Sequence, residues 1–331
     1  MGRLVLLQTS PRVAPGLLTA QAWDAVRTAD AVLCGEPGTE IEQAVAAAGV
    51  DVETATDPLP ALLGACDGGR TAVWLAADDD DLADTLAAEV VARAERGDET
   101  LEVEVLAGSY DLPGSRLLDL VEVMDQLRQH CPWDREQTHR SLVRYLVEES
   151  YETLEAIEGG DRDHLREELG DLMLQVMFHS RIAAEHPDDP WTVDDVAADI
   201  VEKLVRRHPH VFAGLDVAGV DEVDANWETI KSAEKQRSSV LEGIPTAMPA
   251  LSLAEKVLGR AGRVGLEASD VAASAEGESA DPSDDLGARL LGLVAQARAE
   301  GVDPEQALRD AVRRASETIR AAEAADPRKK M

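Results

Sequence analysis

Short apolar runs and stretches of helical periodicity alternate at the start of the chain. Three runs have the length and apolar character of buried strands, at 4–7, 31–34 and 71–75. Apolar residues at helical spacing occupy 20–29, between the first two runs. The same spacing recurs after the third run, up to about Arg96. Strands that alternate with helices in this way predict an α/β domain over residues 1–105.

Beyond residue 115 the apolar positions recur every three or four residues, which is the spacing of one helix face. A break in this pattern is expected at 131–134, and the pair Gly159 and Gly160 is expected to end a helix. We therefore predict an all-helical domain over 115–245. The chain as a whole is predicted to be an α+β protein of several domains.

The last part of the chain repeats some of this helical pattern. The segment Glu-Leu-Gly-Asp-Leu-Met-Leu at 168–174 aligns with Asp-Leu-Gly-Ala-Arg-Leu-Leu at 285–291. Residues 250–325 are therefore interpreted as a shortened, degenerate second copy of the helical module, in which Ala288 replaces the carboxylate of Asp171. The segment 268–284, rich in Ala, Ser, Glu, Asp and Gly, is expected to be a flexible linker.

Composition and charge narrow the class of protein. The formal net charge is −33, from 65 acidic and 32 basic residues. Such a surface repels nucleic acids and anionic membranes, so neither is expected as a partner. No apolar stretch has the length of a membrane span, the first residues lack the features of a signal peptide, and the three cysteines have no disulfide or zinc-site spacing. We expect a cytoplasmic protein.

Two neighbouring helical segments carry pairs of carboxylates three residues apart. Glu149 and Glu152 share one helix face, and Glu168 and Asp171 share another, next to apolar positions. Four acids held together at half-buried positions are costly unless a cation neutralises them. Oxygen ligands without Cys or His at ligand spacing favour Mg²⁺, with Mn²⁺ as a substitute.

Two alternatives are open for these acids. They can form a solvated face, because carboxylates are mostly exposed in proteins and this chain has many of them. A di-iron site of the ferritin type needs Glu-x-x-His on two helices. Here the residue three positions after Glu152 is Glu155, and neither Glu149 nor Glu168 has a histidine at that spacing, so di-iron chemistry is disfavoured.

Cationic side chains suited to phosphate lie further along the chain. Lys203 and Arg207 are four residues apart on one predicted helix, and Trp227 and Lys231 have the same spacing on a later one. The planar guanidinium of arginine can bind two phosphate oxygens. A tryptophan beside a lysine can pack against a nucleotide while the lysine contacts phosphate. Purely structural roles stay open for these residues. Basic side chains near a helix C-terminus interact favourably with the helix dipole, and a tryptophan on a helix is often part of a hydrophobic core.

These motifs together resemble the MazG family of all-α nucleotide pyrophosphohydrolases. The family signature, EExxE followed by ExxD, matches Glu148-Glu149-x-x-Glu152 and Glu168-x-x-Asp171, and the similarity extends to Cys131-Pro132-Trp133-Asp134 and to Arg207-His208-Pro209-His210-Val211-Phe212. The resemblance implies a homodimeric enzyme that hydrolyses nucleoside triphosphates to the monophosphate and pyrophosphate. It also implies a house-cleaning role on non-standard nucleotides, with broad specificity.

The resemblance further implies roles for the motif residues. The Mg²⁺ ligands, which also carry catalysis, would be Glu149, Glu152, Glu168 and Asp171, with Glu148 beside them to orient water or substrate. The triphosphate would be bound by Lys203, Arg207, Trp227 and Lys231, with Arg166 as a further phosphate contact. In the expected mechanism, water activated by metal and a nearby carboxylate attacks the α-phosphorus, and pyrophosphate leaves.

The N-terminal part resembles the tetrapyrrole methylase domain that is fused to some MazG proteins, over 17–20 and 29–33. The glycine-rich loop expected after the first strand is replaced by residues 8–12, Gln-Thr-Ser-Pro-Arg, so we expect a degenerate domain. Degenerate outer domains favour a second hypothesis, a non-enzymatic nucleotide-binding regulator or scaffold. The intact acids of the first helical module argue against this regulator hypothesis. Incubating the protein with Mg²⁺ and mixed triphosphates and identifying the products distinguishes an enzyme from a regulator.

Overall fold

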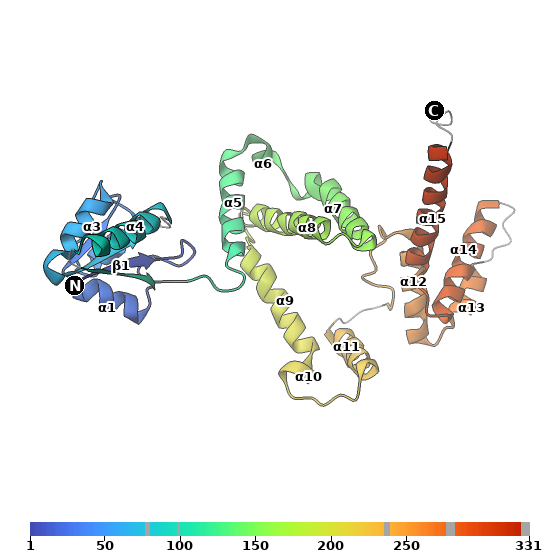
Figure 1. The fold of residues 1–331 in the computed structure, drawn as a ribbon. Helices are drawn as coiled ribbons and strands as arrows, with labels where there is room; N and C mark the ends of the chain where they lie inside the picture. The colour runs from blue at the N-terminus through green and yellow to red at the C-terminus, as the bar shows by residue number, and fades with distance from the viewer. Residues whose placement is uncertain (77–79, 98–99, 235–238, 276–281, 326–331) are drawn as a thin grey trace. The chain divides into compact units, whose positions relative to one another are not determined.

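A computed structural model of the chain describes residues 1–76, 80–97, 100–234, 239–275 and 282–325. Contacts divide the chain into two compact units, Met1–Val201 and Glu202–Met331. The first unit holds a parallel sheet with its helices and a group of longer helices, and the second is helical (Figure 1). This combination agrees with the α+β class predicted from the sequence.

The N-terminal domain is built on a five-stranded parallel sheet in the order β3-β2-β4-β1-β5. The strands are β1 (Gly2–Gln8), β2 (Ala31–Cys34), β3 (Glu53–Thr54), β4 (Thr71–Ala76) and β5 (Leu101–Ala107). The three predicted strands are confirmed as β1, β2 and β4. The other two were not predicted, because the prediction rested on continuous apolar runs, whereas β3 is two polar residues long and β5 alternates apolar residues with glutamates.

Helices cover both faces of this sheet. They are α1 (Ala20–Thr28), α2 (Glu40–Ala47), α3 (Pro58–Cys66) and α4 (Asp80–Arg96). Val5 and Leu7 pack in one cluster with α1 and α2, whereas Leu4 and Leu6 pack in another with α3 and α4. Successive side chains of a strand point to opposite faces, so the uninterrupted apolar run of β1 is buried on both sides.

Seven helices of differing length follow the sheet. They are α5 (Arg116–His130), α6 (Pro132–Glu136), α7 (His139–Gly159), α8 (Arg162–Ala183), α9 (Val193–Arg207), α10 (Pro209–Phe212) and α11 (Val220–Glu234). The break expected at 131–134 is partly wrong, since α6 occupies most of it. Pro132 fits the first turn of α6, where a missing N–H costs no helical hydrogen bond.

A tight turn folds α7 and α8 into a hairpin. Gly160 ends α7 in the left-handed conformation, with φ at 71°, which glycine adopts without steric cost. The side chain of Asp161 then caps α8 by accepting hydrogen bonds from the backbone N–H groups of Asp163 and His164. The glycine pair therefore ends the helix, as predicted.

The core of this helical region joins α5, α7 and α8 through Met124, Leu142, Met177 and Phe178. Leu142 is 1% exposed, so Leu142→Ala is expected to lower the free energy of unfolding by about 2–5 kcal/mol through lost burial and a residual cavity. Urea unfolding followed by helical circular dichroism measures this loss. Leu112→Ala, at a residue that is 67% exposed, is the control, and equal losses for both variants contradict the described packing.

Further α-helices follow in the described part of the second unit. They are α12 (Ala250–Ala261), α13 (Ala268–Ser274), α14 (Pro282–Ala299) and α15 (Pro304–Ala325). The prediction of a flexible linker over 268–284 is wrong at its start, where α13 lies, and at its end, where α14 begins. Ala272 of α13 is buried with Leu258 and Val294, because a small side chain lets the helices approach closely. Residues 276–281 of that segment lie outside the described residues.

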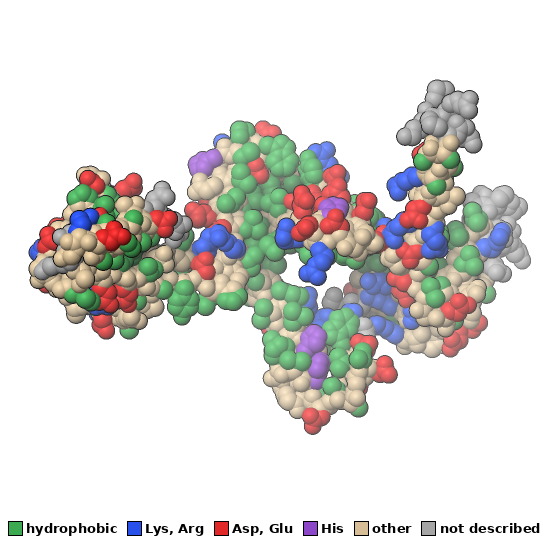
Figure 2. Space-filling view, in the orientation of Figure 1, with side chains coloured by type: hydrophobic (Ala, Val, Ile, Leu, Met, Phe, Trp, Pro, Cys, Tyr) green, Lys and Arg blue, Asp and Glu red, His purple; other side chains and the backbone are tan. Residues whose placement is uncertain are grey.

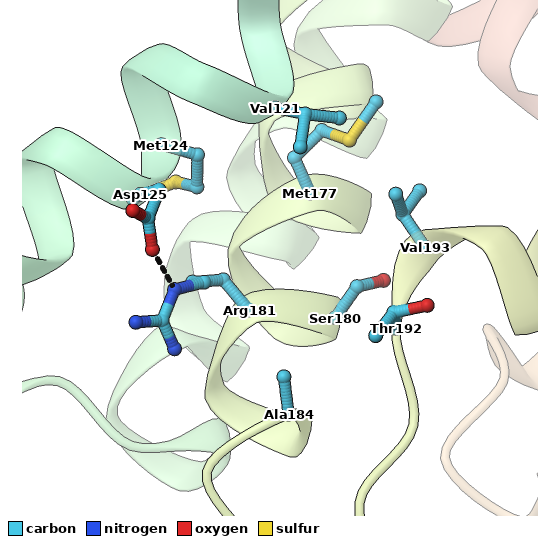
Figure 3. A pocket seen from close by; sticks show the side chains of 9 residues that line it. All are labelled: Val121, Met124, Asp125, Met177, Ser180, Arg181, Ala184, Thr192 and Val193. Atoms are coloured by element: carbon cyan, nitrogen blue, oxygen red, sulfur yellow. Dashed lines mark hydrogen bonds and ion pairs between the residues drawn. The ribbon is translucent and has the colours of Figure 1, made fainter. Parts of the chain in front are cut away.

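Large apolar side chains remain exposed on the helices after the sheet, and they form much of the visible surface there (Figure 2). Examples on α5, α7, α8 and α9 are Val123, Val147, Val176 and Val201. A mostly apolar cavity of about 170 Å³ is lined by α5, α8 and the start of α9. An ion pair between Asp125 and Arg181, at 2.8 Å, lies among its lining residues (Figure 3).

Among the described residues, no helix combines the length and the apolar character that crossing a bilayer requires.

Candidate metal and phosphate site

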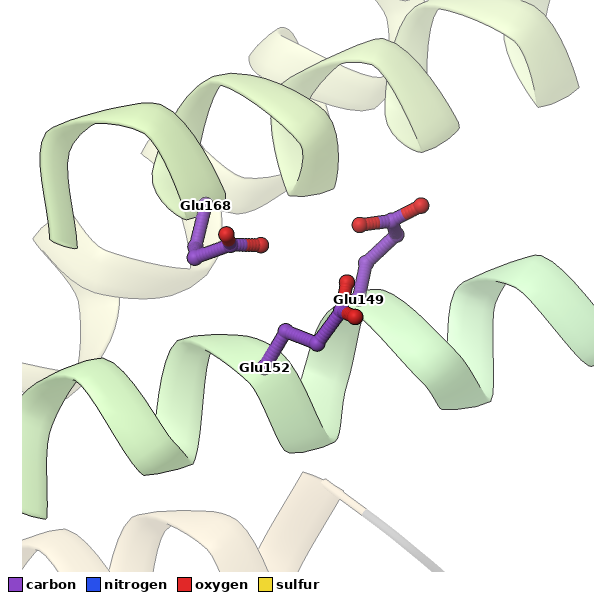
Figure 4. A group of neighbouring side chains, drawn as sticks. All are labelled: Glu149, Glu152 and Glu168. Carbon is purple, nitrogen blue, oxygen red and sulfur yellow. The ribbon is translucent and has the colours of Figure 1, made fainter. Parts of the chain in front are cut away.

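Three acidic side chains from two helices of the hairpin face one another. Glu149 and Glu152 project from α7, and Glu168 projects toward them from α8 (Figure 4). One carboxylate oxygen from each residue lies within 4.8 Å of the others. The turn through Gly160 is responsible, because it brings the middle of α7 opposite the early turns of α8. The prediction that these two helices gather their acids is therefore confirmed for these three residues.

Glu168 is the most buried of the three, with 7% of the residue exposed. Its Oε1 lies 2.9 Å from Nε2 of His164, one helical turn earlier on α8. Its Oε2 is buried and accepts no hydrogen bond from any residue that the structure describes. A buried carboxylate oxygen without a partner is unfavourable, and a cation among these acids would satisfy it.

The electrostatic environment of Glu149 also favours a cation among these acids. Burial raises the pKa of its carboxyl, and the negative charges of Asp171 and Glu152 raise it further. Asp171 is outside the group of three close carboxylates, yet its charge is the strongest of those acting on Glu149. The donor set consists of carboxylate oxygens, so the residues fit a hard divalent cation such as Mg²⁺.

This pKa shift predicts how pH and metal affect stability. At low pH Glu149 is protonated in both the folded and the unfolded chain, and it contributes nothing to the pH dependence. As pH rises through its raised pKa, the folded state must lose a proton that the unfolded chain has already lost, so stability falls. At neutral pH without metal, Glu149→Gln is therefore expected to raise Tm, and added Mg²⁺ is expected to raise the Tm of the wild type more than that of the variant.

Thermal unfolding with and without Mg²⁺, in chelator-treated buffer, measures both effects. Glu155→Gln is the control, since Glu155 is exposed on α7 and lies on a different face from Glu149. A Tm for metal-free Glu149→Gln below that of the wild type contradicts the described repulsion.

Glu148 and Arg166, which were predicted to contact water, substrate or phosphate, lie on the surface. Glu148 is exposed next to Glu149 on α7, and its charge also raises the pKa of Glu149, after burial and the other acids. Arg166 has 82% of its side chain exposed and pairs with Asp163 at 3.3 Å. Residues two positions apart do not share a helix face, so Arg166 and Glu168 point in different directions from α8.

The cations expected to bind phosphate come from α9 and α11, at positions assigned to the second unit. The guanidinium of Arg207 lies 5.2 Å from the centre of the Trp227 ring, and Nζ of Lys231 lies 4.1 Å from the same centre. Arg207 is 9% exposed, whereas Lys203, four residues earlier on α9, is exposed. The structure therefore brings Arg207, Trp227 and Lys231 together around one aromatic ring.

Two side chains of these clusters were not predicted from the sequence. His164 contacts Glu168 from four residues earlier on α8, and this spacing on one helix face is a signal that the sequence itself carries. Glu234 lies one turn after Lys231 on α11 and binds both Arg206 and Arg207. Its pairing joins two helices, and the spacing within either helix alone does not reveal it.

A known protein family matches the part of the chain that carries these acids. The family model described as the MazG nucleotide pyrophosphohydrolase domain matches residues 137–212. The matched segment includes the three close acids, Asp171 and both Lys203 and Arg207. It ends before Trp227 and Lys231.

Relatives match much longer parts of the chain. A 26.1 kDa protein of Streptomyces cacaoi is 52% identical over 67% of this chain and 88% of its own length. A nucleoside triphosphate pyrophosphohydrolase of Mycolicibacterium smegmatis is 40% identical over 81% of this chain and 74% of its own. The nucleoside triphosphate pyrophosphohydrolase/pyrophosphatase MazG of Thermotoga maritima is 41% identical over 59% and 81%. This chain therefore belongs to the MazG family of nucleoside triphosphate pyrophosphohydrolases.

Proposed function

We propose that the acids of the α7–α8 hairpin hold Mg²⁺ for the hydrolysis of nucleoside triphosphates to the monophosphate and pyrophosphate. The reaction is that of the family to which the chain belongs. One observation carries the metal assignment: Glu168, whose carboxylate lies in a close group with those of Glu149 and Glu152, has a buried oxygen without a hydrogen-bond partner among the described residues. The proposed ligands are Glu149, Glu152, Glu168 and Asp171.

Each group of this chain then has a distinct task. When bound, Mg²⁺ offsets the negative charge of the triphosphate and makes water a better nucleophile. Glu148, exposed beside the three acids, orients the attacking water, and His164 holds Glu168 in place by the close contact between its Nε2 and Oε1 of Glu168. Attack of the water oxygen on the α-phosphorus forms one P–O bond and breaks the bond to the bridging oxygen. The water gives its proton to a nearby carboxylate, and negative charge develops on the departing pyrophosphate.

Four residues of α9 and α11 are proposed to bind the triphosphate: Lys203, Arg207, Trp227 and Lys231. Support comes from the burial of Arg207 and from its position, with Lys231, against the Trp227 ring. A planar guanidinium matches two phosphate oxygens at once, and an ammonium adds a point charge. Contacts to phosphate are independent of the base, so we propose broad base specificity, with Arg166 as an outer phosphate contact.

Product analysis tests the reaction directly. The full-length protein is incubated with ATP, dTTP or dITP in Mg²⁺ buffer, and the products are separated by ion-exchange chromatography. Monophosphate and pyrophosphate in equal amounts are expected, with no turnover in EDTA. Diphosphate and orthophosphate contradict the proposed cleavage at the α-phosphorus.

A homodimer is proposed on the basis of the exposed apolar side chains on α5, α7, α8 and α9. On α9 they recur at helical spacing, as Val201, Leu204 and Val205, and all are more than a third exposed. Apolar surface of this extent is unusual on a monomer and is typical of a protein interface. Light scattering after size exclusion is expected to give twice the chain mass.

The outer domains are proposed to be degenerate. In the N-terminal domain, a cavity of about 250 Å³ lies at the carboxyl end of β1, where a methylase-like domain would need its glycine-rich loop. Residues 9–11, Thr-Ser-Pro, line it instead. The helices α12 to α15 are proposed to be the shortened second module, without its metal ligands, since Ala288 is buried where the first module has Asp171.

A further inference from the structure

A single carboxylate ties together the cationic cluster of α9 and α11. Glu234 Oε2 accepts hydrogen bonds from Nε of Arg207 at 3.1 Å and from its Nη2 at 2.5 Å. Glu234 Oε1 accepts a hydrogen bond from Nε of Arg206 at 2.7 Å. The side chains of Glu234 and Arg207 are 17% and 10% exposed, so this pair is largely shielded from water.

The geometry leaves part of the Arg207 guanidinium available. Glu234 occupies one edge of the fork, formed by Nε and Nη2, and the Trp227 ring lies against the guanidinium. Nη1 donates no hydrogen bond to any residue in the described part of the chain. An arginine held along one edge and supported by an aromatic ring loses little rotational freedom when a ligand binds its other end.

We propose that Glu234 is a positioning residue, which fixes Arg207 against Trp227 so that the Nη1 end of the guanidinium is directed at a phosphate group. The inference rests on the proposed role of Arg207 in binding the triphosphate. Without Glu234, Arg207 keeps its charge but loses its fixed direction, and phosphate binding pays the cost of ordering it. The carboxylate is positioning, since it contacts the arginine and not the substrate.

The pairing persists across the pH range of an assay. Hydrogen bonds from Arg207 and Arg206 lower the pKa of Glu234 to about 2. Glu234 therefore remains ionised at every pH used in an assay, and the effect of removing it is expected to be independent of pH.

Glu234→Gln tests the inference in the full-length protein. We expect KM for ATP to rise about tenfold while kcat changes by less than about threefold, because one charge-assisted hydrogen bond is misdirected. Calorimetric titration with inorganic tripolyphosphate is expected to show the same loss of affinity, since the contact is to phosphate. Glu234→Asp keeps the charge and is expected to recover part of the affinity.

Glu202→Gln is the matched control. Glu202 binds Arg206 but not Arg207, is 76% exposed, and its change removes the same charge from the same cluster. We expect its KM and its tripolyphosphate affinity to stay within about twofold of the wild type. Partial unfolding of Glu234→Gln would lower kcat without raising KM, so the two parameters separate a folding defect from a positioning defect.

Two results overturn the inference. If Glu234→Gln binds tripolyphosphate more tightly than the wild type, Glu234 competes with phosphate for Arg207. If Glu234→Gln behaves like Glu202→Gln, Glu234 does not direct Arg207. Tripolyphosphate binding is measured without turnover, so failure of the proposed hydrolysis is recognised separately from failure of this inference.

Discussion

Replacing Glu168 with glutamine is expected to lower kcat for triphosphate hydrolysis by about 100- to 1,000-fold while the protein stays folded. The amide has nearly the shape of the carboxylate, so the packing of this buried residue is kept. It carries no charge, however, and it offers one oxygen where Glu168 offers two. The loss follows because the Glu168 carboxylate belongs to the close group with Glu149 and Glu152, and one of its oxygens is buried without a hydrogen-bond partner among the described residues.

Glu167→Gln is the matched control for this experiment. Glu167 is the preceding residue on α8, is exposed, and its replacement removes the same charge. Adjacent helical residues face different directions, so this variant is expected to keep the wild-type rate within about twofold. Steady-state rates of pyrophosphate release, with circular dichroism to check folding, give the comparison. Equal rates for Glu168→Gln and the wild type contradict the assignment of Glu168 to the site.

The second large effect is expected at Arg207. Arg207→Lys keeps the positive charge but replaces a planar fork with a single ammonium, which can neither bind two oxygens side by side nor stay paired along one edge with Glu234. Hydrogen bonds to charged groups contribute about 1.5–3 kcal/mol, so kcat/KM is expected to fall about 10- to 100-fold.

Arg206→Lys is the matched control, because it makes the same replacement at the neighbouring arginine of the cluster. Arg206 also binds Glu234, but 45% of its side chain is exposed and its Nη1 is already paired with Glu202. We expect kcat/KM of this variant to change by less than about threefold. A larger fall for Arg206→Lys than for Arg207→Lys contradicts the proposed division of roles between the two arginines.

Much of the metal site could be predicted because its residues lie on helices, where spacing fixes direction. Glu149 and Glu152 are three residues apart, so the sequence alone places them on one face of α7. The glycine pair that ends α7 predicts a turn, and a turn between two amphipathic helices predicts that their faces meet. The close group of three carboxylates follows from these local rules.

Other features depend on contacts between distant residues, and spacing does not reveal them. The alternation of apolar residues and glutamates in β5 is itself typical of a strand, but the prediction rested on continuous apolar runs, and the pairing of β5 with β1 is set by the rest of the sheet. Alanine-rich α13 has the composition of a linker, and its burial depends on the neighbouring helices. Glu234 pairs with Arg207 across two helices, 27 residues apart in the sequence, so neither helix alone predicts the contact.

Titration with Mn²⁺, followed by the loss of the free-ion EPR signal, tests the metal assignment most directly because it counts bound cations without any turnover. We predict that the wild type and Glu167→Gln bind Mn²⁺ equally, that Mg²⁺ competes for the same sites, and that Glu168→Gln loses at least about tenfold in affinity. Unchanged Mn²⁺ binding by Glu168→Gln would contradict the claim that these carboxylates hold the catalytic metal.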